Sequence, residues 1–194
     1  METERGLLLK TTKPDGLAYN GFRWPAEVGA EIIAPDWNPD PGINCGQGLH
    51  GLLWGEGNAD LLNWAPGALW RVLSADPADI VSSAGGGKVR CRAVRQEYVG
   101  DRLTATAMIL AARPGALCVG ATVTGGDDAT VTGGDRATVT GGDRATVTGG
   151  DRAMVQLRWW DGQRYRITIA YVGEQNILAG QRYRLDALHQ MVAV

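Results

Sequence analysis

The sequence lacks the residues that mark several common classes of protein. It holds three cysteines in 194 residues, Cys45, Cys91 and Cys118, and they have no Cys-x-x-Cys spacing. This excludes a disulfide framework of several bridges and a zinc site of the finger type, and it favours a reducing compartment. The formal net charge of −2 argues against a nucleic-acid partner.

Long apolar runs are also missing. No stretch approaches the roughly 20 residues that a membrane-spanning helix needs, so we expect no membrane partner. The first residues, Met-Glu-Thr-Glu-Arg-Gly, lack the basic region of a signal peptide, and we expect a soluble protein without an export signal. No cluster of residues predicts a metal site or a cofactor.

What the chain has is a short repeat. Residues 121–152 contain Ala-Thr-Val-Thr-Gly-Gly-Asp four times, followed by Asp once and by Arg three times. In an extended chain Ala and Val point to one side and the two threonines to the other, while Gly-Gly turns the chain. We predict an inward core of Val123, Val131, Val139 and Val147. The predicted outward repeat surface is Thr122, Thr124, Thr130, Thr132, Thr138, Thr140, Thr146 and Thr148.

A fixed short period is typical of one structural unit stacked on itself, here a short β-solenoid. If each copy forms one side of a flattened coil, two copies make a 16-residue turn and the four copies make two turns. So few turns must be capped by flanking structure or by another copy of the chain. We therefore expect docking on the C-terminal strands or self-association.

The predicted fold class is α+β, mostly β, in three parts. Residues 1–99 form an α+β domain, residues 100–153 the β-solenoid segment, and residues 154–194 antiparallel β-hairpins that cap it. The hairpin signal is Asp161-Gly162 between two strand-like runs. Residues 100–106 are interpreted as a degenerate copy of the repeat.

The first part holds the only nearby nucleophile and base, in Cys45-Gly46-Gln47-Gly48-Leu49-His50. We interpret this segment as a glycine-rich loop whose turns His50 stabilises, and we name His50 as the one candidate catalytic residue. Residues 85–88, Gly-Gly-Gly-Lys, are not predicted to bind phosphate, because they lack the first glycine of a phosphate-binding loop and precede a strand rather than a helix.

Two resemblances set these residues in context. Residues 20–24, Asn-Gly-Phe-Arg-Trp, together with the Cys45–His50 motif and the octapeptides, resemble a group of uncharacterised phage and bacterial proteins. That resemblance implies a phage or prophage setting, in the host cytoplasm or on the virion, with a viral or host protein or the chain itself as partner. We predict a non-enzymatic structural or interaction module in which the β-solenoid supports assembly. The repeat is similar to bacterial ice-nucleation repeats, and its outward threonines to those of ice-binding β-solenoids.

Two alternatives to the structural module therefore stay open. The first is an ice-binding protein that works through the outward Thr-x-Thr ladders. The second is an enzyme, because the Gly-Leu-His segment and residues 76–81 are similar to segments of ADP-ribosyltransferase-like folds. Calcium binding is not expected, because the period is eight and the third glycine of the nonapeptide repeats is missing.

Overall fold

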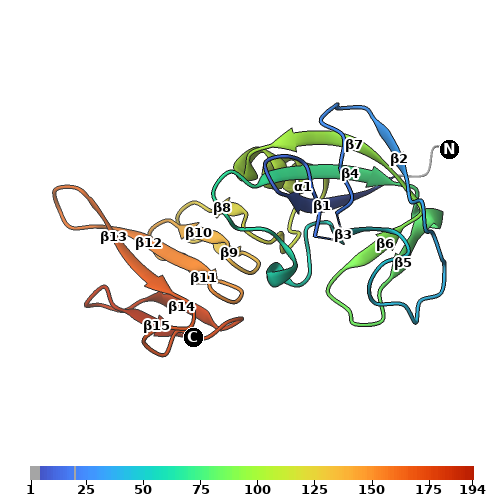
Figure 1. Cartoon of the computed structure of the whole chain (residues 1–194). Coiled ribbons are helices and arrows are strands. Elements are labelled where there is room, and N and C mark those ends of the chain that lie inside the picture. The colour runs from blue at the N-terminus through green and yellow to red at the C-terminus, as the bar shows by residue number, and fades with distance from the viewer. Residues whose placement is uncertain (1–4, 20) are drawn as a thin grey trace. The chain divides into compact units, whose positions relative to one another are not determined.

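The computed structural model describes residues 5–19 and 21–194, and Asn20 of the predicted motif lies outside them. These residues form three β-sheets and one α-helix, α1 (Arg102–Ala112), as Figure 1 shows. The chain divides into two compact units, residues 1–116 and residues 117–194, and each is described by itself.

The predicted fold class is wrong in two respects. The first unit is built on a seven-stranded antiparallel sheet and is mostly β rather than α+β. The repeats do not form a β-solenoid segment of their own. They supply short strands to two four-stranded sheets, and the C-terminal strands complete both sheets. Four copies are too few to bury an independent core, which is why the flanking strands share it.

The sheet of the first unit has the order β2-β7-β4-β1-β3-β6-β5. Its strands are β1 (Gly6–Thr12), β2 (Glu31–Ile33), β3 (Leu49–Leu53), β4 (Leu69–Ala75), β5 (Ile80–Ser82), β6 (Val89–Cys91) and β7 (Ala93–Gly100). Two short 3-10 helices, Ala59–Leu61 and Pro77–Asp79, follow the caps Asn58 and Asp76, whose side chains accept backbone N–H groups. The central strand β1 is buried on both faces, since Leu8 and Leu9 are both fully buried.

Helix α1 replaces the degenerate repeat copy that we predicted at residues 100–106. Asp101 caps it, because its carboxylate accepts the backbone N–H of Thr104 at 2.9 Å. The helix buries Ala105, Thr106 and Ile109. An N-cap aspartate followed by alanine, leucine and methionine favours a helix over an extended strand.

Two arginines inside the first unit, Arg71 and Arg90, are fully buried. Arg90 donates to the carbonyl oxygens of Asn38 (2.9 Å), Gln47 (2.8 Å) and Asp40. Arg71 donates to the carbonyl oxygen of Pro25 at 2.6 Å. Both guanidinium groups therefore hold irregular segments against the sheet through neutral oxygens.

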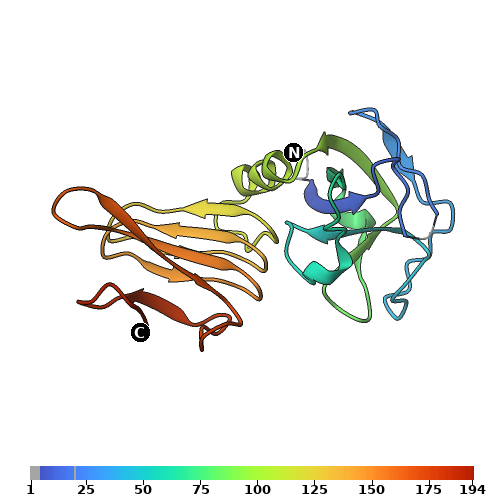
Figure 2. The same ribbon diagram turned by 60° about the vertical axis from the view of Figure 1, so that its left-hand side comes forward.

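In the second unit, successive copies of the repeat alternate between two sheets. One sheet has the order β13-β12-β10-β8 and the other β15-β14-β11-β9. The strands are β8 (Thr122–Thr124), β9 (Thr130–Thr132), β10 (Thr138–Gly141), β11 (Thr146–Thr148), β12 (Met154–Trp160), β13 (Tyr165–Tyr171), β14 (Arg182–Leu185) and β15 (Met191–Ala193). Figure 2 shows the short strands of the repeat in successive layers.

Copies two apart pair in parallel, so one layer contains sixteen residues. Thr138 pairs with Thr122, and Thr146 pairs with Thr130. The strands after the repeat pair differently: β12 is parallel to β10 but antiparallel to β13, and β14 is antiparallel to β11. The hairpin β12–β13 forms where it was predicted, with a loop of residues 161–164.

Each position of the repeat has one structural role. The side chains of Val131, Val139 and Val147 are buried in the core between the two sheets, and Val123 packs against that core partly exposed. The last residue of each copy, such as Arg144, has a positive φ of 55° and turns the corner. The second glycine allows adjacent layers to approach closely, because a Cβ on Gly142 would lie 2.6 Å from the backbone nitrogen of Asp127.

This close approach predicts a large difference between two equivalent glycines. We expect Gly142→Ala to lower the free energy of unfolding of the second unit by about 1–3 kcal/mol, because backbone must move to accept the methyl group. Gly126→Ala is the matched control: it changes the same position of the first copy, where nothing lies within 4 Å of the added Cβ. Denaturant unfolding with hydrogen exchange of residues 117–194 measures both. Equal effects would show that the layers are farther apart than described.

Candidate functional site

The repeat places its threonines in register on the outer faces of two sheets. On one sheet Thr122 pairs with Thr138 and Thr124 with Thr140. On the other sheet the register gives the equivalent pairs, Thr130↔Thr146 and Thr132↔Thr148. Each sheet thus carries a two-by-two threonine array, with about 4.8 Å between strands and about 6.6 Å along a strand.

Exposure falls from the first copies to the last. Thr122, Thr124, Thr130 and Thr132 are exposed. Thr138, Thr140 and Thr146 are partly exposed, and Thr148 is buried at 8% exposure. The outward threonines predicted from the sequence therefore include one that solvent barely reaches.

Each array ends where the C-terminal strands begin. On the first sheet the next outward residue is Gln156, whose Nε2 donates to Thr140 Oγ1 at 2.6 Å. On the second sheet the strand partner of Thr148 is Arg182. The outer face of each sheet therefore carries threonines on its two repeat strands, and other side chains on the strand that pairs next.

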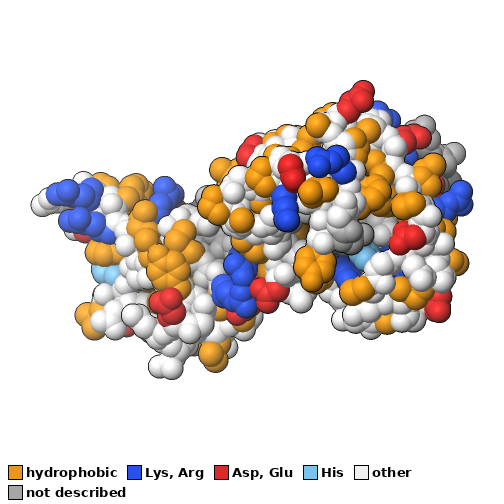
Figure 3. Space-filling view, viewed as in Figure 1, with side chains coloured by type: hydrophobic (Ala, Val, Ile, Leu, Met, Phe, Trp, Pro, Cys, Tyr) orange, Lys and Arg blue, Asp and Glu red, His pale blue; other side chains and the backbone are white. Residues whose placement is uncertain are grey.

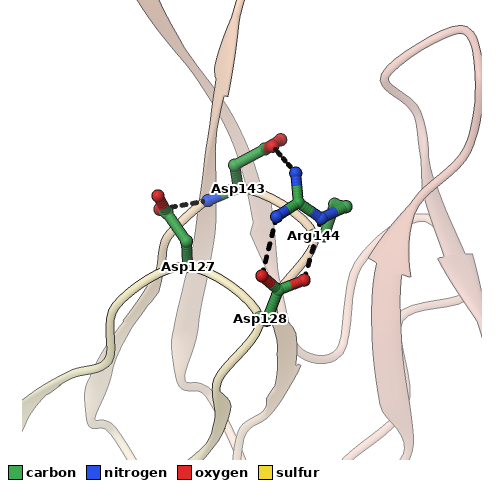
Figure 4. Close-up of polar contacts among 4 residues, drawn as sticks. All are labelled: Asp127, Asp128, Asp143 and Arg144. Atoms are coloured by element: carbon green, nitrogen blue, oxygen red, sulfur yellow. Dashed lines mark hydrogen bonds and ion pairs between the residues drawn. The ribbon is translucent and has the colours of Figure 1, made fainter.

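The corners of the repeat bind one layer to the next (Figure 4). Arg144 binds Asp128 of the previous layer through two hydrogen bonds, from Nε at 2.8 Å and from Nη2 at 2.7 Å. Arg144 also donates to Asp143 at 2.6 Å. The carboxylate of Asp127 accepts the backbone N–H of Asp143 at 2.9 Å.

The hydrogen bond from Arg144 is the main cause that lowers the pKa of Asp128. Both side chains are largely exposed, so their ion pair contributes little to stability. These carboxylates are already paired, and no group of three potential metal ligands occurs within residues 5–19 and 21–194.

The predicted candidate His50 lies in strand β3 and not in a loop. Its Nε2 atom is buried and has no hydrogen-bond partner. Burial is the largest cause that lowers the pKa of His50, to about 4, and the nearby charges of Lys88, Lys10 and Arg90 act in the same direction. His50 is therefore a neutral imidazole at pH 7.

The structure does not join His50 to Cys45 as a nucleophile and base. Cys45 is exposed, and its Sγ lies 3.5 Å from Nζ of Lys88. A cavity of about 140 Å³ lies in the second unit and is lined by residues that include Asp143, Leu157 and Trp159. His50 does not line this cavity. The hypothesis of an ADP-ribosyltransferase-like enzyme stays a prediction.

The pKa of His50 predicts how stability depends on pH. The unfolded chain takes up a proton near pH 6.5, whereas the folded chain does so only near pH 4. The unfolded state therefore binds more protons in this window, and we expect the stability of the first unit to fall as the pH drops from 6.5 towards 4. In the variant His50→Gln, the free energy of unfolding should depend less steeply on pH between 6.5 and 4. NMR titration of the His50 ring measures the pKa directly, and a value near 6.5 would contradict the buried environment.

One surface of the second unit was not predicted as a candidate site. Strand β13 places Tyr165, Ile167, Ile169 and Tyr171 on one face, each 50–55% exposed. In Figure 3 hydrophobic side chains lie over the β12–β13 region beside a group of Lys and Arg. The alternation Tyr-Arg-Ile-Thr-Ile-Ala-Tyr carried this signal, because its bulky apolar residues recur at every second position.

The described residues contain no helix that is long and apolar enough to cross a membrane. The fold and the site define a mostly-β repeat protein whose second unit presents two small threonine arrays and one apolar sheet face.

Known proteins with a related sequence are ice nucleation proteins. The chain is 31% identical over 111 residues to an "Ice nucleation protein" of Pseudomonas syringae, and 32% identical over 111 residues to one of Pseudomonas syringae pv. syringae. Each match covers 57% of this chain but 9% of the relative's length. No protein-family model and no solved structure matches the chain.

The match is longer than residues 121–152 and supports the predicted similarity to ice-nucleation repeats. These relatives are bacterial and give no support to a phage setting. The phage origin and the family of the Cys45–His50 motif stay predictions.

Proposed function

We propose that the second unit binds ice or ice-like ordered water through its threonine arrays. The observation that carries the proposal is the register of the repeat, because equivalent threonines lie side by side on parallel strands at a fixed spacing. A threonine hydroxyl can hold a water molecule, and the adjacent methyl group limits the other positions that water can take.

Rigidity supports the same function. The buried valines between the threonines belong to a closed core. The β-branched threonine side chain has few rotamers, so its hydroxyl stays in place. A surface that is ordered before it binds loses little entropy when water molecules settle on it.

The similarity to ice nucleation proteins supports the proposal independently of the geometry, because the name of these relatives states an action on ice. The arrays here are small, and the matched relatives are far longer than the matched stretch. We therefore propose binding to ice or modest promotion of freezing, and not the activity of a whole ice nucleation protein.

The test compares lysines placed inside and outside the arrays. Thr124→Lys and Thr132→Lys each put a long charged side chain in one array at an exposed position. Gln163→Lys is the control, because it adds the same charge in the exposed loop between β12 and β13. The measurements are the fraction of protein taken into slowly growing ice and the freezing temperature of supercooled droplets.

We expect the wild type and Gln163→Lys to enter ice more than an inert protein does, and at least one array variant to lose this excess. If the wild type enters ice no more than an inert protein and leaves the droplet freezing temperature unchanged, the proposed function is wrong. If the combined variant Thr124→Lys/Thr132→Lys, which alters both arrays, also behaves as the wild type does, ice binding is not a property of the threonines.

A further inference from the structure

We infer that strand β13 pairs with β13 of a second copy of this chain, antiparallel and about a two-fold axis at Thr168. Strand β13 is the last strand of its sheet, and no described strand pairs with its other edge. It is seven residues long and pairs with β12 without a register shift. It contains neither proline nor glycine. A long regular edge of this kind, without proline, glycine or a bulge, favours the addition of another strand.

The backbone of β13 has hydrogen-bonding groups directed towards this open edge. At one end of the β12–β13 hairpin Val172 donates its N–H to Ala153, and at the other end Asp161 donates to Arg164. Antiparallel pairs alternate between bonded and non-bonded pairs, so Arg166, Thr168 and Ala170 direct their N–H and C=O groups towards β12. The alternate residues Tyr165, Ile167, Ile169 and Tyr171 direct theirs outward.

The same four residues carry the apolar face. Their side chains are 50–55% exposed, and the neighbouring Trp160 on β12 is 53% exposed. A second strand on the edge would therefore satisfy the outward backbone groups and cover part of this apolar face at once. Exposed apolar faces of this kind on a sheet mark interaction surfaces.

The sequence of β13 identifies the occupant as another copy of β13. Tyr-Arg-Ile-Thr-Ile-Ala-Tyr reads almost the same in both directions. In antiparallel register about Thr168, each Tyr165 faces Tyr171 of the other copy and each Ile167 faces Ile169. A two-fold interface requires this kind of self-complementarity, because the same patch must meet itself.

The charges agree with this register. Arg166 lies opposite Ala170 of the other copy, and Arg164, just before the strand, lies opposite Val172. No arginine of β13 therefore faces an arginine across the axis. If the two-fold axis lay two residues closer to the hairpin loop, at Arg166, each Arg166 would face Arg166 of the other copy, which like-charge repulsion disfavours.

The pairing goes beyond ice binding and does not depend on it. It would join the two β13-containing sheets edge to edge, so that the threonine arrays on β8 and β10 of both copies belong to one continuous sheet. A failure of the ice-binding test would leave the pairing untouched, because the pairing is measured as mass in solution.

The experiment uses two double variants of the full chain that differ only at one position. In Ile167→Lys/Ile169→Lys every lysine faces a lysine of the other copy, and we expect the dimer dissociation constant to rise at least about 100-fold. In Ile167→Lys/Ile169→Glu each lysine faces a glutamate, and we expect dimers to persist. Val194→Lys, directly after the edge strand β15 of the other sheet, is the control that should leave the dimer unchanged. Light scattering and sedimentation across concentrations measure the mass against 20.6 kDa for one chain.

A mixing experiment checks the register a second way. Ile167→Lys/Ile169→Lys and Ile167→Glu/Ile169→Glu should each be monomeric alone and form dimers when mixed. Circular dichroism shows whether each variant is folded, and the single change Ile167→Lys, which places each lysine opposite an isoleucine, replaces Ile167→Lys/Ile169→Lys if that variant is not folded. A wild type that is monomeric up to high concentration, or a dimer that Ile167→Lys/Ile169→Lys leaves intact, would overturn the pairing. Loss of dimers in the Lys/Glu variant as well as the Lys/Lys variant would overturn the register.

Discussion

Val139→Asp is expected to unfold the second unit of the protein. Val139 has no exposed surface and lies in register between Val123 and Val155 in the core between the two sheets. The new carboxylate would have apolar side chains around it and no donor to pair with. We expect the unit to lose more than about 4 kcal/mol, which approaches the whole stability of a small domain.

Thr130→Asp is the control for this substitution. Thr130 is exposed on strand β9, so its carboxylate would stay in water. We expect a change within about 1 kcal/mol, mostly the lower preference of aspartate for strands. Thermal unfolding followed by circular dichroism, with hydrogen exchange of residues 117–194, separates the two outcomes. Similar melting of the two variants would show that the inward and outward faces of the repeat are assigned wrongly.

Much of the repeat could be predicted because its side chains alternate without interruption. The period of eight and the two glycines leave room for a strand of three or four residues and a corner, so Val139 faces inward and Thr138 outward. The pairing of copies sixteen residues apart also follows from that period. The strands that follow the last repeat could not be placed from the sequence. No local pattern indicates that β12 pairs in parallel with β10 in one sheet, while β14 pairs antiparallel with β11 in the other.

The first unit shows where local patterns mislead. Alternating charged and apolar residues, as along residues 88–95, are typical of a half-exposed strand, but Arg90 is covered by residues 36–48, whose carbonyl oxygens it binds. Such a contact joins residues about 50 positions apart, and no spacing rule reports it. His50 was assigned to a loop because of the surrounding glycines. The pairing of His50 with Arg90 across β3 and β6 makes that segment a strand.

The two candidate surfaces, the threonine arrays and the apolar face of β13, could also be predicted only in part from the sequence. The threonine arrays could be proposed from the repeat alone, whereas the partial burial of Thr138, Thr140, Thr146 and Thr148 depends on the neighbouring strands. The apolar face of β13 was visible as an alternation. That β13 is an edge strand could not be predicted, because it depends on the strand order of the sheet. In an interior strand the same alternation would indicate only core packing.

A deletion of sixteen residues should be tolerated, whereas a deletion of eight should not. Removing residues 129–144 takes out β9 and β10, one strand from each sheet. Strand β12 can then pair with β8, since Thr122 is the equivalent of Thr138 in the preceding layer. The corner at Asp128 leads directly into Ala145, which has the same position in its copy as Ala129. We expect a folded second unit with one layer fewer.

Removing only residues 137–144 takes out β10 and leaves one sheet a strand short. Strand β11 would then follow β9 into the wrong sheet, and the β12–β13 hairpin would be moved to the opposite face. Leu157 and Trp159 would lose the packing that the core between the sheets provides, so we expect misfolding or aggregation. Circular dichroism and light scattering compare the two deletions. If the eight-residue deletion is the one that preserves the fold, each copy is a complete layer by itself and the sixteen-residue pairing of the strands is wrong.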